Sequence, residues 1–268
     1  MFSQNFLKAN GFILGKQFFR AIKSENGFTL RRFAANSECV NTSSGQAIVI
    51  NHEQLFDFKN DWPTEERSEF LKSMLVVNDF VSEAEEAMML KEAEQSIKRL
   101  RYEFDHWDNA IHGYRETEKK NWYPDNRAVV NRVSKFAFDG NAMAYVHVLD
   151  LAADGVIKAH VDSTRYCGST IAGLSLLTDC IMRLRRVDES EYDQSGAGSG
   201  KQISSKSVKG DSKHSHYVDV LLKRRSLYVM GGLSRYKFSH EVLPTNSEFR
   251  GAAVNKDRRI SIICRNEP

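Results

Sequence analysis

Between residues 145 and 184 the chain alternates apolar and polar side chains, and this stretch constrains the possible folds more than any other part of the sequence. The apolar residues that set the alternation are Val146, Val148 and Leu151. The pair Asp154-Gly155 is typical of a two-residue hairpin turn, so we predict a second strand directly after it. The stretch is therefore expected to begin with a β-hairpin.

The motif His160-Val161-Asp162 stands at the end of that second strand. Side chains on a strand alternate between its two faces, so His160 and Asp162 would project from the same face, close enough to share one metal ion. A third candidate ligand, His240, lies in a later strand-like run at residues 237–243. Two histidines and one carboxylate form the facial triad of non-haem iron(II) oxygenases, which leaves three coordination positions open.

A His-x-Asp pair is a weak signal by itself, because a histidine beside an acid is also found on ordinary surface strands. The chain contains a second such pair in His106-Trp107-Asp108, just past a helical stretch. This second pair shows neither strand alternation nor a matching third ligand, and we interpret it as structural. The residues near the C-terminus favour the metal interpretation of the first pair.

A β-branched run near the C-terminus places two arginines on one strand face. The residues on that face are Arg259, Ser261, Ile263 and Arg265. Two guanidiniums suit a dicarboxylate, because each presents a planar fork of donors and neither loses its charge at any relevant pH. The alternative is a strand whose arginines pair with surface acids, and for this run taken alone that alternative is the better interpretation.

The order His-x-Asp, distant His, then Arg-x5-Arg resembles the iron(II)/2-oxoglutarate dioxygenases of the AlkB family, in particular its mitochondrial representatives. The segments that carry the resemblance are residues 101–118, 147–162, 166–177, 226–241 and 258–265. Together they span most of residues 76–268. The resemblance implies that His160, Asp162 and His240 hold Fe(II), that Tyr228, Arg259 and Arg265 bind 2-oxoglutarate, and that O2 is the second substrate.

Residues 1–33 have the composition of a mitochondrial presequence. They carry six basic residues against one acidic residue, together with several phenylalanines. The run Arg31-Arg32-Phe33-Ala34 resembles a processing site with cleavage after Phe33. The alternatives are a disordered basic tail or a membrane-surface helix. No run of eighteen apolar residues occurs, so no membrane span is predicted.

The mature chain is predicted to form one α+β domain, a β-barrel or double-sheet jelly roll with flanking N-terminal helices. The resemblance makes this core a double-stranded β-helix at residues 76–268, preceded by a linker and short helix at 34–75. A capping box at Ser82–Glu85 predicts one helix, and apolar spacing predicts another over 127–138. Strands are expected at 170–177, 180–187, 217–222, 226–230, 237–243 and 259–265.

Two segments are expected to be irregular. The Ser/Gly/Asp/Lys-rich segment 188–216 is predicted to be a disordered insertion. The aromatic segment 102–123 is predicted either to pack beneath the barrel or to form part of the cavity rim.

The net charge of +3 is no sign of nucleic-acid binding, because it belongs to the leader. Beyond residue 33 there are 32 basic and 34 acidic residues, a net of −2. AlkB-type repair enzymes carry an asparagine and a tyrosine on the strand leading to the metal motif, where this chain has Leu149-Asp150-Leu151. Both features disfavour base demethylation, since phosphate contacts supply much of the affinity for nucleic acid. Four cysteines without Cys-x-x-Cys spacing indicate a reducing compartment.

Three functions stay open on these grounds. The first is an oxygenase of the mitochondrial matrix that acts on a protein side chain or a small metabolite, for which the resemblance implies roles in regulated necrosis after alkylation damage and in fatty-acid metabolism. The second is a demethylase of methylated mitochondrial RNA. The third is a sensor module that binds iron and 2-oxoglutarate without turnover.

Overall fold

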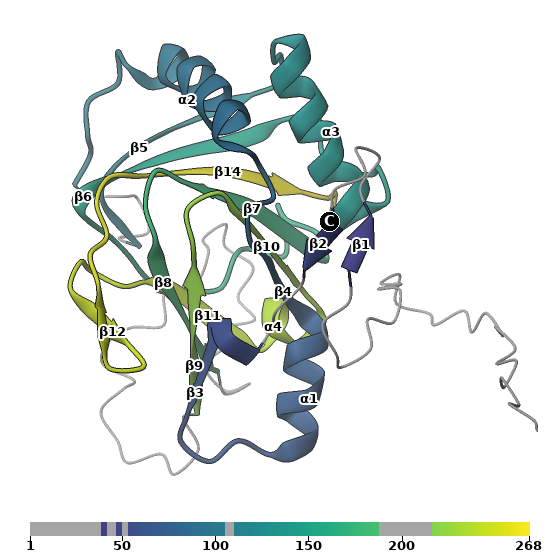
Figure 1. The fold of residues 1–268 in the computed structure, drawn as a ribbon, viewed down its shortest axis with the longest axis vertical. Coiled ribbons are helices and arrows are strands. Elements are labelled where there is room, and N and C mark those ends of the chain that lie inside the picture. Colours follow the sequence, from purple (N-terminus) through teal and green to yellow (C-terminus); the bar gives the residue numbers. More distant parts are fainter. Residues whose placement is uncertain (1–38, 42–46, 50–52, 105–109, 188–215) are drawn as a thin grey trace, which may run out of the picture.

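The computed structural model describes residues 39–41, 47–49, 53–104, 110–187 and 216–268. Their centre is a curled antiparallel sheet with helices on its outside (Figure 1). The predicted presequence, the second His-x-Asp pair at 106–108 and residues 188–215 of the predicted insertion lie outside the described ranges. None of the helices in these ranges is long and apolar enough to cross a membrane.

The helices lie in two places. α2 (Glu83–Ile97) and α3 (Pro124–Phe138) lie together over one side of the sheet, and α1 (Thr64–Ser73) lies beside the short α4 (Gly232–Tyr236) (Figure 1). α2 begins with the predicted capping box, in which Ser82 and Glu85 each accept a hydrogen bond from the other's backbone amide. α3 begins at Pro124 rather than at residue 127, because proline is well suited to the first helical position.

Ten of the described strands form one continuous hydrogen-bonded sheet. Its path is β3 (Phe56–Lys59), β9 (Tyr217–Leu222), β8 (Cys180–Arg186), β11 (Phe238–Val242), β6 (Val146–His160), β14 (Arg259–Arg265), β7 (Thr170–Leu176), β10 (Ser226–Gly231) and β4 (Met74–Val77), with β5 (Ile111–Lys119) paired to β6. Two small hairpins lie apart from it, β1 (Cys39–Asn41) with β2 (Ala47–Val49) and β12 (Ser247–Phe249) with β13 (Ala252–Val254). A short 3-10 helix, Glu53–Leu55, precedes β3.

Strand β6 joins the two halves of the curled sheet. Its first part, residues 147–151, pairs with β14, and its end pairs with β11. The resulting double-stranded β-helix confirms the fold expected from the sequence, a jelly-roll core with flanking helices.

The hairpin predicted at Asp154-Gly155 is wrong, because β6 runs through this pair without reversing. Gly155 lies against Gly113 of β5, and a Cβ added at Gly155 would be 2.6 Å from the Gly113 carbonyl oxygen. The glycine therefore permits a close approach of two strands. From the sequence alone, a glycine with this role cannot be distinguished from a glycine in a turn.

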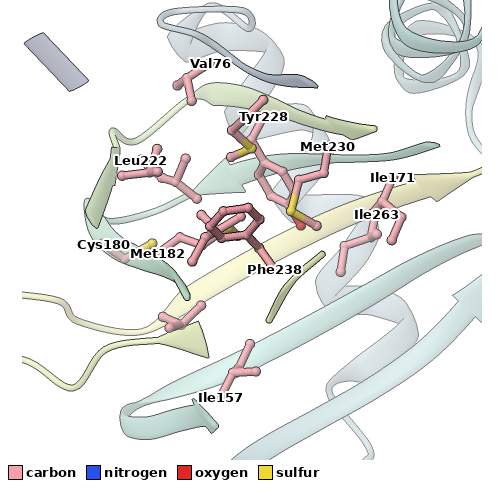
Figure 2. Close-up of a cluster of buried hydrophobic side chains, with 14 of the residues drawn as sticks. Val76, Ile157, Ile171, Cys180, Met182, Leu222, Tyr228, Met230, Phe238 and Ile263 are labelled. Atoms are coloured by element: carbon pink, nitrogen blue, oxygen red, sulfur yellow. The ribbon is translucent and has the colours of Figure 1, made fainter. Parts of the chain in front are cut away.

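Alternation along the strands sorts their side chains into two layers. On β14, Ile260 and Ile262 face the helices, where they join a core that includes Met89 of α2 and Val133 of α3. The opposite faces of the strands fill the inside of the barrel. Figure 2 shows this inner cluster, in which Tyr228 lies among apolar side chains that include Met230 and Phe238.

Several described elements differ from the sequence predictions, among them the small hairpins β1–β2 and β12–β13, which were not expected. β3 lies within the segment 34–60 that was expected to be a linker, yet it pairs with β9 over its whole length. β5 was not predicted, because its second half, residues 115–119, is polar and charged and shows no apolar alternation. α4 begins at Gly232, within the turn between two predicted strands.

Candidate iron and 2-oxoglutarate site

The end of β6 and the middle of β11 bring the three predicted metal ligands together. His160 is the last residue of β6, Asp162 follows two residues later, and His240 is the ladder partner of His160. One ligand atom from each side chain lies within 4.8 Å of the others, and the two imidazole centroids are 4.2 Å apart. Three side chains from two neighbouring strands thus converge on a space of the size of one metal ion.

A backbone contact orients the first imidazole. Nδ1 of His160 lies 2.8 Å from the carbonyl oxygen of Lys158, so this nitrogen carries a proton and donates it. Nε2 is then the nitrogen that faces Asp162, whose Oδ1 is 3.4 Å away. A hydrogen bond on the remote ring nitrogen is what usually fixes the tautomer of a metal-binding histidine.

The protonation states also suit a metal ion. Loss of contact with water, reinforced by the neighbouring His160, lowers the pKa of His240 to about 3 and keeps its imidazole neutral. Burial acts to raise the pKa of Asp162, but the neighbouring His160 and the charge of Arg265 outweigh it and hold the pKa well below its usual range. A neutral imidazole and an ionised carboxylate are the forms that bind a divalent cation.

Arg235 of α4 holds the segment that carries Asp162. Only 2% of this arginine is exposed, and it is among the largest fully buried side chains. Its Nη1 donates to the carbonyl oxygen of Asp162 at 2.9 Å, and its Nη2 lies 3.4 Å and 3.3 Å from the carbonyl oxygens of Ser163 and Cys167. A buried guanidinium thus fixes a segment that has no strand partner of its own.

Two guanidiniums from β14 face the same cavity as the triad. Nε of Arg259 donates to the hydroxyl of Ser175 at 3.0 Å, while its buried Nη2 has no hydrogen-bond partner in the described part of the chain. Nη1 of Arg265 lies 3.3 Å from Nδ1 of His147, and within the same described ranges its buried Nε has none. Buried donors are nearly always paired, so two unpaired ones indicate a place for an anion.

Tyr228 lies near both arginines and Asp162, and Gly173 makes room for it. The two residues are ladder partners on β10 and β7. A Cβ added at Gly173 would lie 2.5 Å from Cε1 and 2.6 Å from the hydroxyl oxygen of Tyr228, so only glycine leaves space for the phenol. Burial, partly offset by the charge of Arg259, raises the pKa of Tyr228 to about 12 and keeps its hydroxyl a donor.

The triad, the tyrosine and both arginines line one cavity of about 520 Å³. Apolar side chains form much of the remaining wall: Ala110, Ile111, Leu149, Ile157, Ile171, Met182 and Val242. Asp150, between the two leucines singled out in the sequence, points to the opposite face of the sheet, where it binds Arg115 and Arg258. The cavity is large enough for a small dicarboxylate beside a metal ion, with an apolar region beyond it.

All six residues predicted for the site lie in this cavity. Four contributors were missed: His147, Gly173, Ser175 and Arg235. None of them has a sequence signal of its own, because each acts through a partner on another strand or through a backbone carbonyl. The ladder register that places Gly173 opposite Tyr228 becomes visible only in the folded chain.

Comparison with known proteins identifies the family to which this chain belongs. The sequence matches the model of the 2OG-Fe(II) oxygenase superfamily over residues 73–265. The chain belongs to this superfamily. The oxygenase is 43% identical over 192 residues to the protein from Bos taurus named alpha-ketoglutarate-dependent dioxygenase alkB homolog 7, mitochondrial, a match that covers 70% of this chain and 76% of the bovine one. The Mus musculus protein of the same name is 42% identical over 192 residues, with the same coverage.

Among solved structures, OsALKBH1 overlays on the oxygenase with a TM-score of 0.48 at 12% identity, over 79% of this chain and 100% of that chain. The family membership and the curated relatives confirm the AlkB resemblance recognised in the sequence. The protein is thus a 2-oxoglutarate-dependent dioxygenase, with Fe(II) as cofactor and 2-oxoglutarate as cosubstrate.

Proposed function

We propose that this dioxygenase oxidises an aliphatic carbon of a protein side chain or small metabolite in the mitochondrial matrix. The observation that carries the proposal is the convergence, in one cavity, of a His-Asp-His triad, two unpaired guanidinium donors and an apolar wall. Bound Fe(II) with 2-oxoglutarate and O2 supplies oxidising power for an unactivated C–H bond, with succinate and carbon dioxide as the coproducts.

His160, Asp162 and His240 are the proposed Fe(II) ligands. Together they present two neutral nitrogens and one carboxylate, the donor set of non-haem iron sites. The hydrogen bond from His160 to the Lys158 carbonyl keeps Nε2 available for the metal. Arg235 limits the movement of Asp162 by its contact to that residue's backbone.

The positions of the two arginines favour a division of labour in binding 2-oxoglutarate. Arg259 is almost fully buried beside Tyr228, and its free Nη2 suits the carboxylate of the cosubstrate that is far from the metal. Arg265 acts electrostatically on Asp162 and is placed to bind the end of the cosubstrate near the metal. Tyr228 donates its hydroxyl to the same ligand.

The wall beyond this polar region favours a hydrocarbon substrate group. Leu149 lines the cavity and Leu151 is buried in the inner core, where repair enzymes of the AlkB type have polar residues. Leucine offers no hydrogen bond to the edge of a flipped base. Residues 34–268 carry a net charge of −2, which gives little attraction to phosphates.

The location rests on the leader and on the relatives. Residues 1–33 have a presequence-like composition, and both curated relatives are named mitochondrial. Together these favour import into the matrix. The AlkB resemblance implies roles in regulated necrosis and fatty-acid metabolism, and a location in the matrix agrees with both.

Two substitutions test the site by separating metal from cosubstrate. Asp162→Ala should lose Fe(II), because an ionised ligand is removed from the ion. Arg259→Met should retain Fe(II) while raising the 2-oxoglutarate requirement about tenfold or more, through loss of a charge-assisted contact. Metal analysis and titration of 2-oxoglutarate measure the two effects. Retention of iron by Asp162→Ala would remove that residue from the ligand set.

Succinate release tests the substrate class. With Fe(II) and 2-oxoglutarate present, matrix protein extract or its small-molecule fraction should accelerate release. Methylated transfer RNA should not, and loss of its methyl group by mass spectrometry would establish RNA demethylation instead. Slow release unaffected by any of these pools would favour a sensor. A pulldown under anaerobic Fe(II) and 2-oxoglutarate then captures the substrate.

A further inference from the structure

Three polar side chains form a chain of contacts across the inside of the sheet from β5 to β14. His147 lies on β6, with β5 on one side and β14 on the other. Its Nε2 is 2.8 Å from Oε2 of Glu116, and its Nδ1 is 3.3 Å from Nη1 of Arg265. All three side chains line the cavity. The imidazole thus links a carboxylate on one neighbouring strand to a guanidinium on the other.

The two hydrogen-bond partners of His147 decide which of its ring nitrogens carries the proton. Arginine has only donors, so Nη1 of Arg265 donates and Nδ1 of His147 accepts. Nε2 then carries the ring proton and donates it to Glu116. The carboxylate therefore selects the neutral tautomer that presents a lone pair to Arg265, as carboxylates do behind metal-binding histidines.

This contact restricts the guanidinium of Arg265. With Nη1 held by His147, the buried Nε is a donor left without a partner among the described residues. Arg265 is the last residue of β14, where a long side chain would otherwise have several rotamers. Ordering such a side chain before a ligand arrives reduces the free-energy cost of binding.

We infer that His147 and Glu116 are positioning residues for 2-oxoglutarate, which act by holding the Arg265 guanidinium with its free donors toward the cavity. The inference rests on the proposed function, in which Arg265 binds the cosubstrate. The partners of His147 on β5 and β14 account for both of its ring nitrogens, so neither nitrogen is left to bind the metal or Arg259.

The sign of the expected effect separates positioning from simple electrostatics. Glu116 and Glu118 both lie on β5 and line the cavity, and Glu118 is the ladder partner of His147. Removing an acid beside an anion site strengthens anion binding if charge alone matters. Removing Glu116 instead weakens binding if its contact with His147 keeps Arg265 in place. Glu118→Leu is therefore a matched control for Glu116→Leu.

The test is calorimetric titration of 2-oxoglutarate into the full chain loaded with Mn²⁺, which fits the same nitrogen and oxygen ligands and avoids turnover. His147→Leu should raise the dissociation constant about tenfold, the loss expected for a contact to a charged group. His147→Gln should stay within about threefold of wild type, because its amide oxygen can accept from Arg265 and its amide nitrogen can donate to Glu116. Glu116→Leu should weaken binding about fivefold, and Glu118→Leu should leave it unchanged or stronger.

Mn²⁺ affinity and melting temperature, measured on each variant, show that the metal site and the fold are retained. Equal weakening in His147→Leu and His147→Gln would overturn the inference. So would a Glu116→Leu variant that binds 2-oxoglutarate as tightly as Glu118→Leu. Absence of 2-oxoglutarate binding in the wild-type protein would instead overturn the proposed function, which keeps the two failures distinct.

Discussion

At the scale of single residues, the site depends on two guanidinium donors that are left for a ligand. Nη2 of Arg259 and Nε of Arg265 are buried donors without partners among the described residues. An anion that accepts from these donors forms charge-assisted hydrogen bonds, each worth roughly 1.5–3 kcal/mol, with the folded chain only. We therefore expect 2-oxoglutarate to stabilise the protein against unfolding as well as to serve as its cosubstrate.

Gly173→Ala tests the fit between β7 and Tyr228. The added methyl group would overlap the phenol ring, so Tyr228 must move or the strands must separate. Overpacking of this kind costs about 1–3 kcal/mol of folding free energy. We expect a lower melting temperature and weaker 2-oxoglutarate binding.

The double variant Gly173→Ala with Tyr228→Leu is the control, because it relieves the overlap while removing the hydroxyl. It should recover melting temperature but not 2-oxoglutarate affinity. A single variant that melts and binds like wild type would show that the phenol does not need this space.

At the scale of elements, a strand could be predicted where burial gives its own sequence an apolar pattern, and not where a distant strand decides its structure. β8, β9 and β14 could be predicted because their apolar alternation is set by burial inside one sheet. β5 could not, since its glutamates face a polar cavity wall and its pattern resembles a surface segment. The pair Asp154-Gly155 was mistaken for a turn because the close approach of Gly113 depends on a strand about forty residues earlier in the chain.

Arg235→Met removes the anchor that α4 provides to the segment after β6. Three carbonyl contacts are lost, and the backbone of Asp162 is no longer held. Fe(II) affinity should fall about tenfold, a typical effect of losing a residue that orients a metal ligand. Metal titration by competition with a chelator measures it. Unchanged affinity would show that Asp162 is held in place without the Arg235 contacts.

Ser82→Ala is the complementary change in α2. The serine hydroxyl accepts from the amide of Glu85 and caps the helix far from the cavity. Its loss should cost about 1 kcal/mol of unfolding free energy and leave Fe(II) and 2-oxoglutarate binding unchanged. Denaturant titration measures the first effect. A loss of binding in this variant would reveal a link between the helix layer and the site.

At the scale of the whole molecule, residues 1–33 are basic, whereas residues 34–268, which include the oxygenase domain, carry a net charge of −2. The six proposed site residues and the family could be recognised from order and spacing along the chain. The supporting residues could not, because His147, Ser175 and Arg235 act through strands and carbonyls that only the fold brings near. The prediction therefore reached the chemistry of the site but not the contacts that hold it in place.

Deleting residues 1–33 tests the leader. The shortened protein should stay outside mitochondria, because the basic and aromatic residues typical of a presequence are gone. Purified, it should release succinate at the wild-type rate. Fluorescence microscopy of a tagged chain and fractionation measure location. Import of the shortened protein would show that the targeting signal lies elsewhere in the chain.

The strand β14 serves two purposes at once, with Ile260 and Ile262 turned to the helices and Arg259 and Arg265 turned to the cavity. A slip of this strand by a single residue would exchange the two sets of side chains. Both arginines would then face the apolar core under the helices, and both isoleucines would face the cosubstrate. Misfolded chains should therefore be inert rather than partly active, and they should be unable to consume 2-oxoglutarate wastefully.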